Sequence, residues 1–227
     1  MWSISEIKNQ GKTALKKNYW RSVLAALLLY ILAGGAAATS SSYGKEAASS
    51  EGVSAIDPMA LAIILTVLIG ILFTVWIVSL ILKIFVFNPL QVGCYSFFKR
   101  NNFEEDVTLS ALKDGFGSYG HVFVTLFLRD LFLCLWTLLF IIPGIIKSYS
   151  YRMVPYIIKD NPELSATEVI KKSREMMDGH KWHTFVYDLS FIGWIILSII
   201  TGGIVQLFWF GPYKANSDAA LYLELSK

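Results

Sequence analysis

Four charged residues of this sequence stand within or beside apolar runs, where a charge has little water to solvate it. Arg129 and Asp130 lie inside the apolar run 121–142, Arg152 follows that run, and Asp188 lies near the start of a later one. An unpaired charge deep in a bilayer is costly, so such residues are functional candidates. We predict that the four side chains form one intramembrane polar cluster, in which Arg152 is the partner of Arg129 and Asp130.

Two interpretations of this cluster remain open. In the first, two arginines and two aspartates neutralise one another and fix how the helices pack. In the second, they line a polar cavity that binds a substrate, a proton or a lipid headgroup.

A second pattern that could do chemistry is the short segment HKWH, in which His180 and His183 lie three residues apart. With Glu175 before it and Asp188 after it, the segment offers ligand types that zinc accepts. The spacing is not that of H-E-x-x-H, and no third ligand follows at a recognised interval. We interpret the two histidines as interfacial anchors and keep them only as weak metal candidates.

The remaining sequence gives no sign of an enzyme. G-x-S-x-G and Walker-type loops are both missing. Cys94 and Cys134 lie in apolar stretches far apart in sequence, so we expect both to be buried free thiols. We therefore expect no catalytic residue, no cofactor and no resident metal.

The composition indicates which kind of protein must position these residues. Of the 227 residues, 55% are hydrophobic and 16% are charged, and the mean hydropathy is +0.52. That is more apolar surface than one soluble core needs, so lipid must be part of the solvent. The formal charge of +3 is too small to indicate a nucleic-acid partner. We predict an all-α membrane protein that forms a single domain.

Strongly apolar runs supply the membrane helices. They cover 20–38, 59–89, 121–142, 184–200 and 204–212. Pro143 with Gly144, and Gly202 with Gly203, interrupt the chain, and we interpret each interruption as a tight turn between antiparallel helices. Continuing past these turns gives six helices in three hairpins, one helix covering 145–159. The first run also fits a signal peptide, but its length favours an uncleaved helix.

The basic residues predict the orientation, because loops rich in lysine and arginine stay in the cytoplasm. Such residues precede the first helix, follow the second, and fill the segment between the fourth and fifth. The loop 39–58 and the two turns lack this excess, so we expect them outside, with Lys147 just past an outer turn. Both ends of the chain then lie in the cytoplasm.

A loose internal repeat matches these hairpins. Each unit has an interfacial helix, a membrane helix, an outer turn and a return helix that ends in aromatic residues and a proline. The closing prolines are Pro89, Pro155 and Pro212. The units cover about 1–100, 101–160 and 161–227.

The interfacial helices carry their own start signals and a basic face. Ser3 with Glu6, and Ser165 with Glu168, have the S-x-x-E spacing of a capping box. Basic residues opposite the apolar faces should attract anionic lipid of the inner leaflet. They are Lys12, Lys16, Lys17, Lys171, Lys172 and Arg174.

The run IIPGIIKSYSYRMVPYIIKDNPEL, which continues to SREMMDGHKWH, and the C-terminal GPYKANSDAALYLEL carry a family resemblance. They resemble a bacterial integral membrane family, the domain of unknown function 975, over most of the chain except 36–58. More distantly, the pattern is similar to membrane domains attached to some glycerophosphodiester phosphodiesterases, where that domain is not the catalytic part. The resemblance implies a multi-pass module of a bacterial cytoplasmic membrane, without an established activity.

We expect a non-enzymatic module that binds, or helps to transport, a hydrophobic or amphiphilic ligand such as a lipid or peptide. The alternative is a membrane scaffold or regulatory partner that docks another protein through Lys171, Lys172 and Arg174. A third hypothesis is a metal-dependent interfacial hydrolase that uses His180, His183 and Asp188.

Overall fold

The computed structural model describes residues 2–32 and 58–227, and all regular structure in these ranges is helical. The expected all-α class is therefore confirmed. The loop expected over 39–58 lies, apart from Pro58, outside the described residues.

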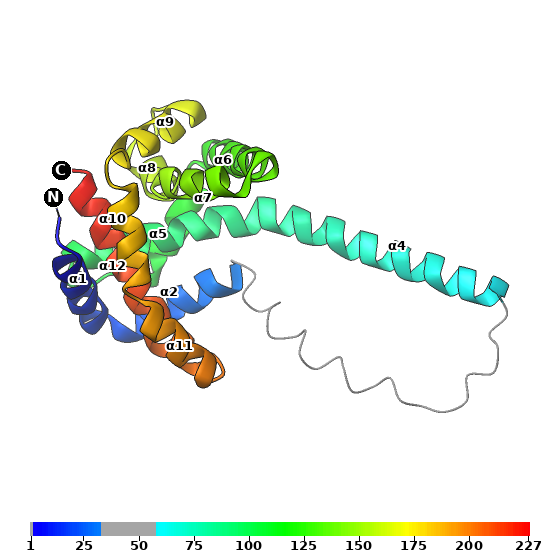
Figure 1. Ribbon diagram of the computed structural model, residues 1–227, viewed down its shortest axis with the longest axis horizontal. Coiled ribbons are helices and arrows are strands. Elements are labelled where there is room, and N and C mark those ends of the chain that lie inside the picture. The colour runs from blue at the N-terminus through cyan, green and yellow to red at the C-terminus, as the bar shows by residue number, and fades with distance from the viewer. Residues whose placement is uncertain (1, 33–57) are drawn as a thin grey trace.

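The helices follow one another in a fixed order along the chain (Figure 1). They are α1 (Ile4–Lys17), α2 (Tyr19–Leu32), α4 (Pro58–Leu82), the π-helix η1 (Lys83–Phe87), α5 (Asn88–Phe103), the 3-10 helix η2 (Leu109–Phe116), α6 (Tyr119–Leu139), α7 (Ile141–Ser150), α8 (Val154–Asp160), α9 (Ala166–Met176), α10 (Lys181–Leu189), α11 (Ile192–Ile200), the π-helix η3 (Gln206–Phe210) and α12 (Gly211–Leu225).

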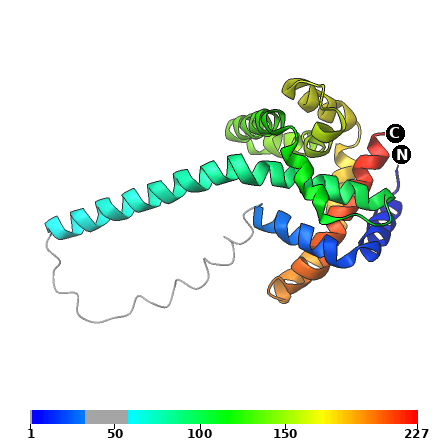
Figure 2. The same cartoon turned by 180° about the vertical axis from the view of Figure 1, so that it is seen from behind.

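Three helical segments of the described chain are long and apolar enough to cross a bilayer. They are Ala62–Ser79 within α4, Tyr119–Leu139, and Lys181–Ile200, which joins α10 to α11. The segment within α4 buries none of its residues against the protein, and α4 projects far from the other helices (Figures 1 and 2). A helix that is apolar all round and unburied needs lipid as its surroundings, so the fold is compatible with a membrane protein.

The core forms where helices that begin at a proline meet. Pro89, Pro155 and Pro212 each lie in the first turn of a helix, namely α5, α8 and α12. The prediction that these prolines end the return helices is therefore wrong for Pro89 and Pro212, where the helix continues through a π-helix, whereas the chain does break just before Pro155. A proline is tolerated in a first turn because the N–H that it lacks has no helical partner there.

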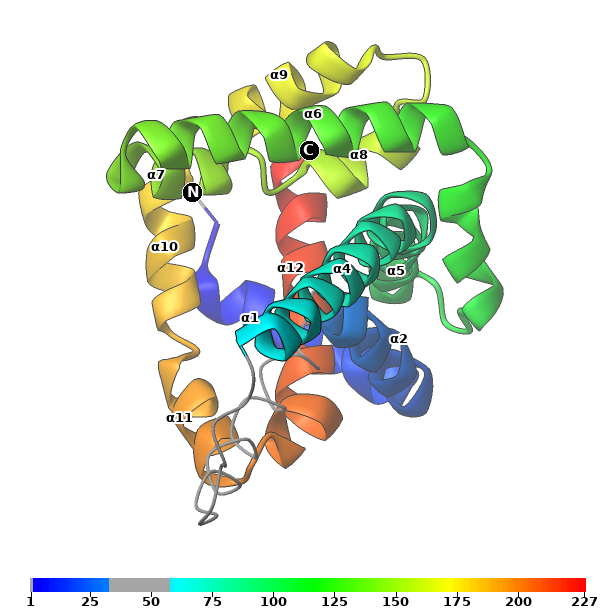
Figure 3. The ribbon, with the colours of Figure 1, turned by 90° about the vertical axis from the view of Figure 1, so that its right-hand side faces the viewer.

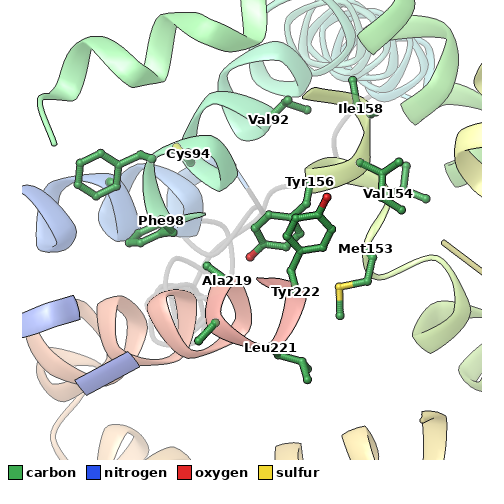
Figure 4. Close-up of a cluster of buried hydrophobic side chains, with 14 of the residues drawn as sticks. Val92, Cys94, Phe98, Met153, Val154, Tyr156, Ile158, Ala219, Leu221 and Tyr222 are labelled. Atoms are coloured by element: carbon green, nitrogen blue, oxygen red, sulfur yellow. The ribbon is translucent and has the colours of Figure 1, made fainter. Parts of the chain in front are cut away.

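Tyrosines from the three proline-started helices contact one another in this core. The rings of Tyr156 and Tyr222 stack with centroids 4.8 Å apart, and Tyr95 meets Tyr156 edge to face at 4.9 Å. Figure 4 shows Tyr156 and Tyr222 among buried aliphatic side chains. Helix α1 packs along α12 beside this core (Figure 1), so the amphipathic N-terminal helix covers it.

Helices α6 and α7 form a hairpin whose turn differs from the predicted one. The chain reverses at Phe140, which is extended, whereas Pro143 and Gly144 lie in the first turn of α7. A Cβ atom on Gly144 would lie 2.8 Å from the Cα atom of Thr137 in α6. Gly144 therefore allows the close approach of the two helices, rather than making the turn.

The predicted continuous helix 145–159 is also wrong, because the chain breaks between α7 and α8. The break covers 151–153 and ends just before Pro155. Within a helix, a proline ring clashes with the carbonyl group four residues earlier, and proline has no backbone N–H to donate a hydrogen bond. The break leaves Arg152 at the junction of two helices.

The α6–α7 hairpin lies across the direction of α4. Figure 1 shows α6 end-on, and Figure 3, in which α4 points toward the viewer, shows α6 lengthwise with α7 against it. Lys147 of α7 lines one pocket with Arg174 and Lys181. The topology predicted from the sequence placed Lys147 near the outer side and placed Arg174 and Lys181 in the cytoplasm. Because the three residues line one pocket, these predicted positions cannot all be right.

The turn at Gly202 and Gly203 is confirmed. Their φ angles of +60° and +88° are ones that glycine adopts without strain, and the N–H of Gly203 donates to the carbonyl of Ser198 at 2.8 Å.

Only one of the two expected capping boxes is confirmed. Ser165 and Glu168 bond reciprocally, and these hydrogen bonds hold the pKa of the Glu168 carboxyl below its ordinary 4.5. Ser3 precedes α1 without a side-chain cap, because its hydroxyl pairs with that of Ser5 at 2.9 Å instead.

We expect Gly144→Ala to destabilise the protein by about 1–3 kcal/mol, because the added methyl group overpacks the α6–α7 contact. The matched control is Gly193→Ala, where a Cβ atom meets nothing within 4 Å and alanine should be neutral or slightly stabilising in the helix. Thermal unfolding in detergent compares the two. Equal midpoints would show that the hairpin does not need this glycine.

Candidate functional site

Arg152 is the centre of a paired charge network. Its guanidinium group donates to both carboxylate oxygens of Asp188, at 2.6 and 3.0 Å, and to Asp218 at 2.9 Å. Lys214 lies 3.0 Å from Asp188 and also pairs with Asp218. Two cations and two anions make the network neutral, and each side chain is less than a third exposed.

Aromatic rings enclose the cations of this network. The Lys214 ammonium lies 4.6 Å from the ring centroid of Tyr187 and 5.3 Å from that of Phe191. The Tyr187 hydroxyl donates to Asp218 at 3.0 Å. Cations over aromatic faces gain electrostatic stabilisation where water is scarce, so the network is well satisfied as it stands.

Three separate elements supply the network. Arg152 comes from the break before α8, Asp188 and Tyr187 from α10, and Lys214 and Asp218 from α12. Arg152 and Asp188, which were expected in one cluster, are in contact, although Arg129 and Asp130 were the expected partners of Arg152. Lys214 and Asp218 were missed, although their spacing of four residues puts both on one face of a helix; Lys214 served only as a topology signal.

Arg129 and Asp130 form a separate pair. Nε and Nη2 of Arg129 both donate to Oδ1 of Asp130, at 2.9 and 2.7 Å. Among the described residues neither side chain is within ion-pair distance of Arg152 or Asp188. The predicted single cluster of four is therefore two groups, because the α6–α7 hairpin does not return through the core as a straight helix.

The Arg129–Asp130 pair lies at an open groove of about 810 Å³ between α2, the η1–α5 junction and α6. Asn88 and Gln91 add polar groups from α5. The other lining residues are Leu32, Phe87, Leu133, Cys134, Thr137 and Leu138. A groove whose wall combines apolar side chains with a few polar groups has the usual make-up of a small-ligand site.

The pair is only partly covered. The Arg129 side chain is 16% exposed and that of Asp130 is 42% exposed. Within the described chain, Nη1 of Arg129 and Oδ2 of Asp130 make no hydrogen bond. Both atoms are thus free to meet a ligand, which distinguishes this pair from the saturated Arg152 network.

The histidines and cysteines do not assemble a metal site. In the part of the chain that the structure describes, no three His, Cys, Asp or Glu side chains gather at metal-binding distance. His183 Nε2 bonds to the carbonyl of Trp2 at 3.1 Å, and its ring meets the Trp2 ring at 4.2 Å. Cys94 is buried, as expected, but Cys134 is exposed and faces the groove.

Some basic residues of the interfacial helices are exposed, and others donate hydrogen bonds within the protein. Lys12 and Lys16 are exposed on α1, whereas Lys17 donates to the Glu104 carbonyl at 3.0 Å. On α9, Lys171 and Arg174 are exposed, but Lys172 donates to Asn161 at 2.7 Å. Those two helices therefore expose fewer free cations than the sequence indicates.

A buried amide network was also missed. Asn101, fully buried, donates to Asn216 at 2.7 Å and to the Ala14 carbonyl at 2.9 Å, and it accepts from Asn18 at 2.8 Å. It joins α5 to α12 and to the end of α1. Asparagine side chains far apart in sequence give no signal that they will meet.

One sequence pattern looks functional but has a packing role. Residues 115–120 read GFGSYG, the spacing of a dinucleotide-binding loop, yet they join η2 to α6 with no strand before them. A Cβ atom on Gly115 would lie 1.7 Å from the Pro89 carbonyl oxygen. The first glycine therefore serves close packing against α5.

The sequence model of a family described as "Protein of unknown function (DUF975)" matches residues 131–227. The match supports the expected resemblance to this family over residues 131–227, which are less than half of the chain. The DUF975 segment contains the whole Arg152 network and begins one residue after Asp130. No curated protein and no solved structure matches the chain, and none of these comparisons supports the similarity to membrane domains of phosphodiesterases.

We expect Arg152→Gln to cost about 3–5 kcal/mol of stability, because it leaves two poorly solvated carboxylates with one lysine. Adding Asp188→Asn restores neutrality and should recover at least half of the loss. The matched control is Arg21→Gln, in an exposed pair with Asp106, where we expect less than about 1 kcal/mol. Chemical unfolding in detergent measures all three. If Arg152→Gln costs no more than Arg21→Gln, the network does not hold the fold.

Proposed function

We propose that the protein is a non-enzymatic, multi-pass membrane module that binds an amphiphilic ligand in the groove at Arg129 and Asp130. The observation that carries this proposal is the groove itself, about 810 Å³ in volume, with a partly covered ion pair in its wall. The Arg152 network is neutral and satisfied, so it supports the fold in this proposal and does not bind the ligand.

The free atoms of the pair indicate the kind of headgroup. Nη1 of Arg129 can donate to a phosphate, and Oδ2 of Asp130 can accept from a primary ammonium. A zwitterionic headgroup that carries both groups complements the pair without leaving a charge unpaired. The apolar walls, including Leu32 and Leu133, suit an acyl chain, and the open side allows exchange with surrounding lipid.

The π-helix η1 lies directly beside this groove. Phe87, its last residue, and Asn88, the first residue of α5, both line the groove. π-Helical turns are rare and occur frequently at functional sites. This placement supports the groove as the functional part of the module.

We also propose a modified version of the six-helix plan. The first and third hairpins cross the membrane, with the loop before α4 and the Gly202 turn outside, and the three hairpins are related units. The α6–α7 hairpin enters the membrane without crossing it. Two observations support this: α7 has ten residues and spans only about 15 Å, and Lys147 lies with Arg174 and Lys181.

Binding is tested with phosphatidylethanolamine that carries one fluorescent acyl chain, added to the purified protein in detergent. We expect Arg129→Gln and Asp130→Asn each to weaken binding about tenfold or more, since each loses a charge-assisted hydrogen bond. Phosphatidylcholine should bind more weakly to the wild type, because its quaternary ammonium group cannot donate to Asp130.

Two further variants sharpen this test. Leu133→Trp fills the groove and should abolish binding while keeping the ion pair, whereas Lys113→Gln, at an exposed residue of η2, should bind normally. The proposal fails if the wild type, both single variants and the double variant of Arg129 and Asp130 all bind the lipid equally well. In that case we would expect each single change to destabilise the protein and the double change to restore its stability. The pair would then be structural.

The topology is tested by cysteine labelling of intact cells in a Cys134→Ser background. We expect a membrane-impermeant maleimide to label Ile200→Cys from outside, to leave Phe140→Cys unlabelled, and to reach Lys113→Cys only after permeabilisation. Ile200 and Phe140 both lie at hairpin turns and are exposed, so they form a matched pair. Outside labelling of Phe140→Cys would instead establish a crossing α6–α7 hairpin.

A further inference from the structure

Cations from three helices gather at a pocket where α7, α9 and α10 meet. Lys147, Lys171, Arg174 and Lys181 line this pocket of about 340 Å³ together with Glu175 and Asp178. Four positive and two negative charges leave a net charge of +2. The pocket is separate from the Arg129 groove, with which it shares no lining residue.

The positive charge of this pocket is poorly compensated. Lys171 lies 3.8 Å from Glu175 and Lys181 lies 3.7 Å from Asp178, at the long end of ion-pair distances. Lys147 and Arg174 have no ion pair within the described ranges, and Arg174 and Lys181 both act on Lys147 as like charges. Like charges held together by three helices are relieved by an anion bound between them.

A second hollow of about 300 Å³, with aromatic side chains in its wall, adjoins the pocket. Phe132, Trp136 and Ile170 line it, and it shares Lys171 and Arg174 with the basic pocket. The Lys147 ammonium lies 4.7 Å from the ring centroid of Trp136, so one cation bridges the two parts. The combined surface has a basic mouth beside an aromatic wall.

This combination selects among anions. A free phosphate would use the cations and leave the aromatic wall unused, whereas a phospholipid can place its phosphate at the mouth and an acyl chain along the wall. The flanking Ile145 and Ile146 of α7 are exposed apolar residues, which suits a position beside lipid. The net charge of +2 favours a headgroup with net negative charge over a zwitterionic one.

We propose that Lys147, Arg174 and Lys181 bind the phosphate of an anionic phospholipid, whose acyl chain lies against Phe132 and Trp136. The site is distinct from the amphiphile groove, because its α6 residues lie on another face of that helix. Phe132 and Trp136 are four residues apart and share a face, while the groove residues Asp130, Cys134 and Leu138 share a different one.

The test uses the full-length protein in detergent and native mass spectrometry with phosphatidylglycerol and phosphatidylcholine. We expect the wild type to retain phosphatidylglycerol in preference to phosphatidylcholine. The double variant Lys147→Gln/Arg174→Gln should retain at least about tenfold less phosphatidylglycerol, since two cations near the phosphate are lost. Lys12→Gln/Lys16→Gln removes two exposed cations of α1 and is the matched control, with retention within about twofold of wild type.

A second readout does not depend on the charge variants. Phosphatidylglycerol with dibrominated acyl chains should quench part of the tryptophan fluorescence, and that part should be absent in Trp136→Phe. Arg129→Gln should leave both readouts unchanged, so failure of the amphiphile groove and failure of this site are distinguishable. Inorganic phosphate at matched ionic strength should not displace the lipid.

Three results would overturn the proposal. If Lys147→Gln/Arg174→Gln and the α1 control Lys12→Gln/Lys16→Gln lose phosphatidylglycerol equally, retention depends on the overall surface charge and not on this pocket. Full displacement by inorganic phosphate would make it a free-anion site. Co-purification of a protein that the pocket variant loses, without any lipid preference, would assign the surface to protein docking.

Discussion

The pairing of Arg152 with two aspartates is the interaction on which the arrangement of the helices most depends. A charged group without water must find a partner within a few ångströms, and Arg152 finds Asp188 on α10 and Asp218 on α12. Those contacts fix the α7–α8 junction against both helices of the C-terminal hairpin. Because removing any one charge leaves another unpaired, the four side chains hold these elements together as a unit.

The prolines determine where that network can form. Pro155 prevents α7 from continuing, and the resulting break puts Arg152 on a short non-helical segment from which it reaches two helices. Pro89 and Pro212 do not stop the chain; a π-helical turn precedes each, and the helix continues as α5 or α12. The same residue type therefore gives a break in one hairpin and a continuous, locally widened helix in the other two.

Sequence reasoning identified the three helical segments that are long and apolar enough to cross a bilayer and the Gly202 turn, and it placed Arg152 and Asp188 in one cluster. Each of these follows from local hydropathy, glycine conformation or the cost of an unpaired charge. Sequence reasoning failed where tertiary packing decides. Arg129 was placed near Arg152 on the assumption that α7 returns straight across the bilayer, but the reversal at Phe140 and the lie of α6 separate them. Lys214 and Asp218 were missed since nothing local shows that α12 packs against α10.

The two proposed lipid sites use different faces of α6, and this has a physical consequence for the hairpin. In the proposed topology the α6–α7 hairpin does not cross the bilayer, so some interaction must keep it at a fixed depth. The groove at the Arg129–Asp130 pair and the basic pocket beside Trp136 both favour polar headgroups, while the tip around Phe140 is apolar and exposed. Headgroup contacts on two faces and lipid around the tip oppose movement in either direction, so the same interactions that bind lipid would hold the hairpin at the membrane surface.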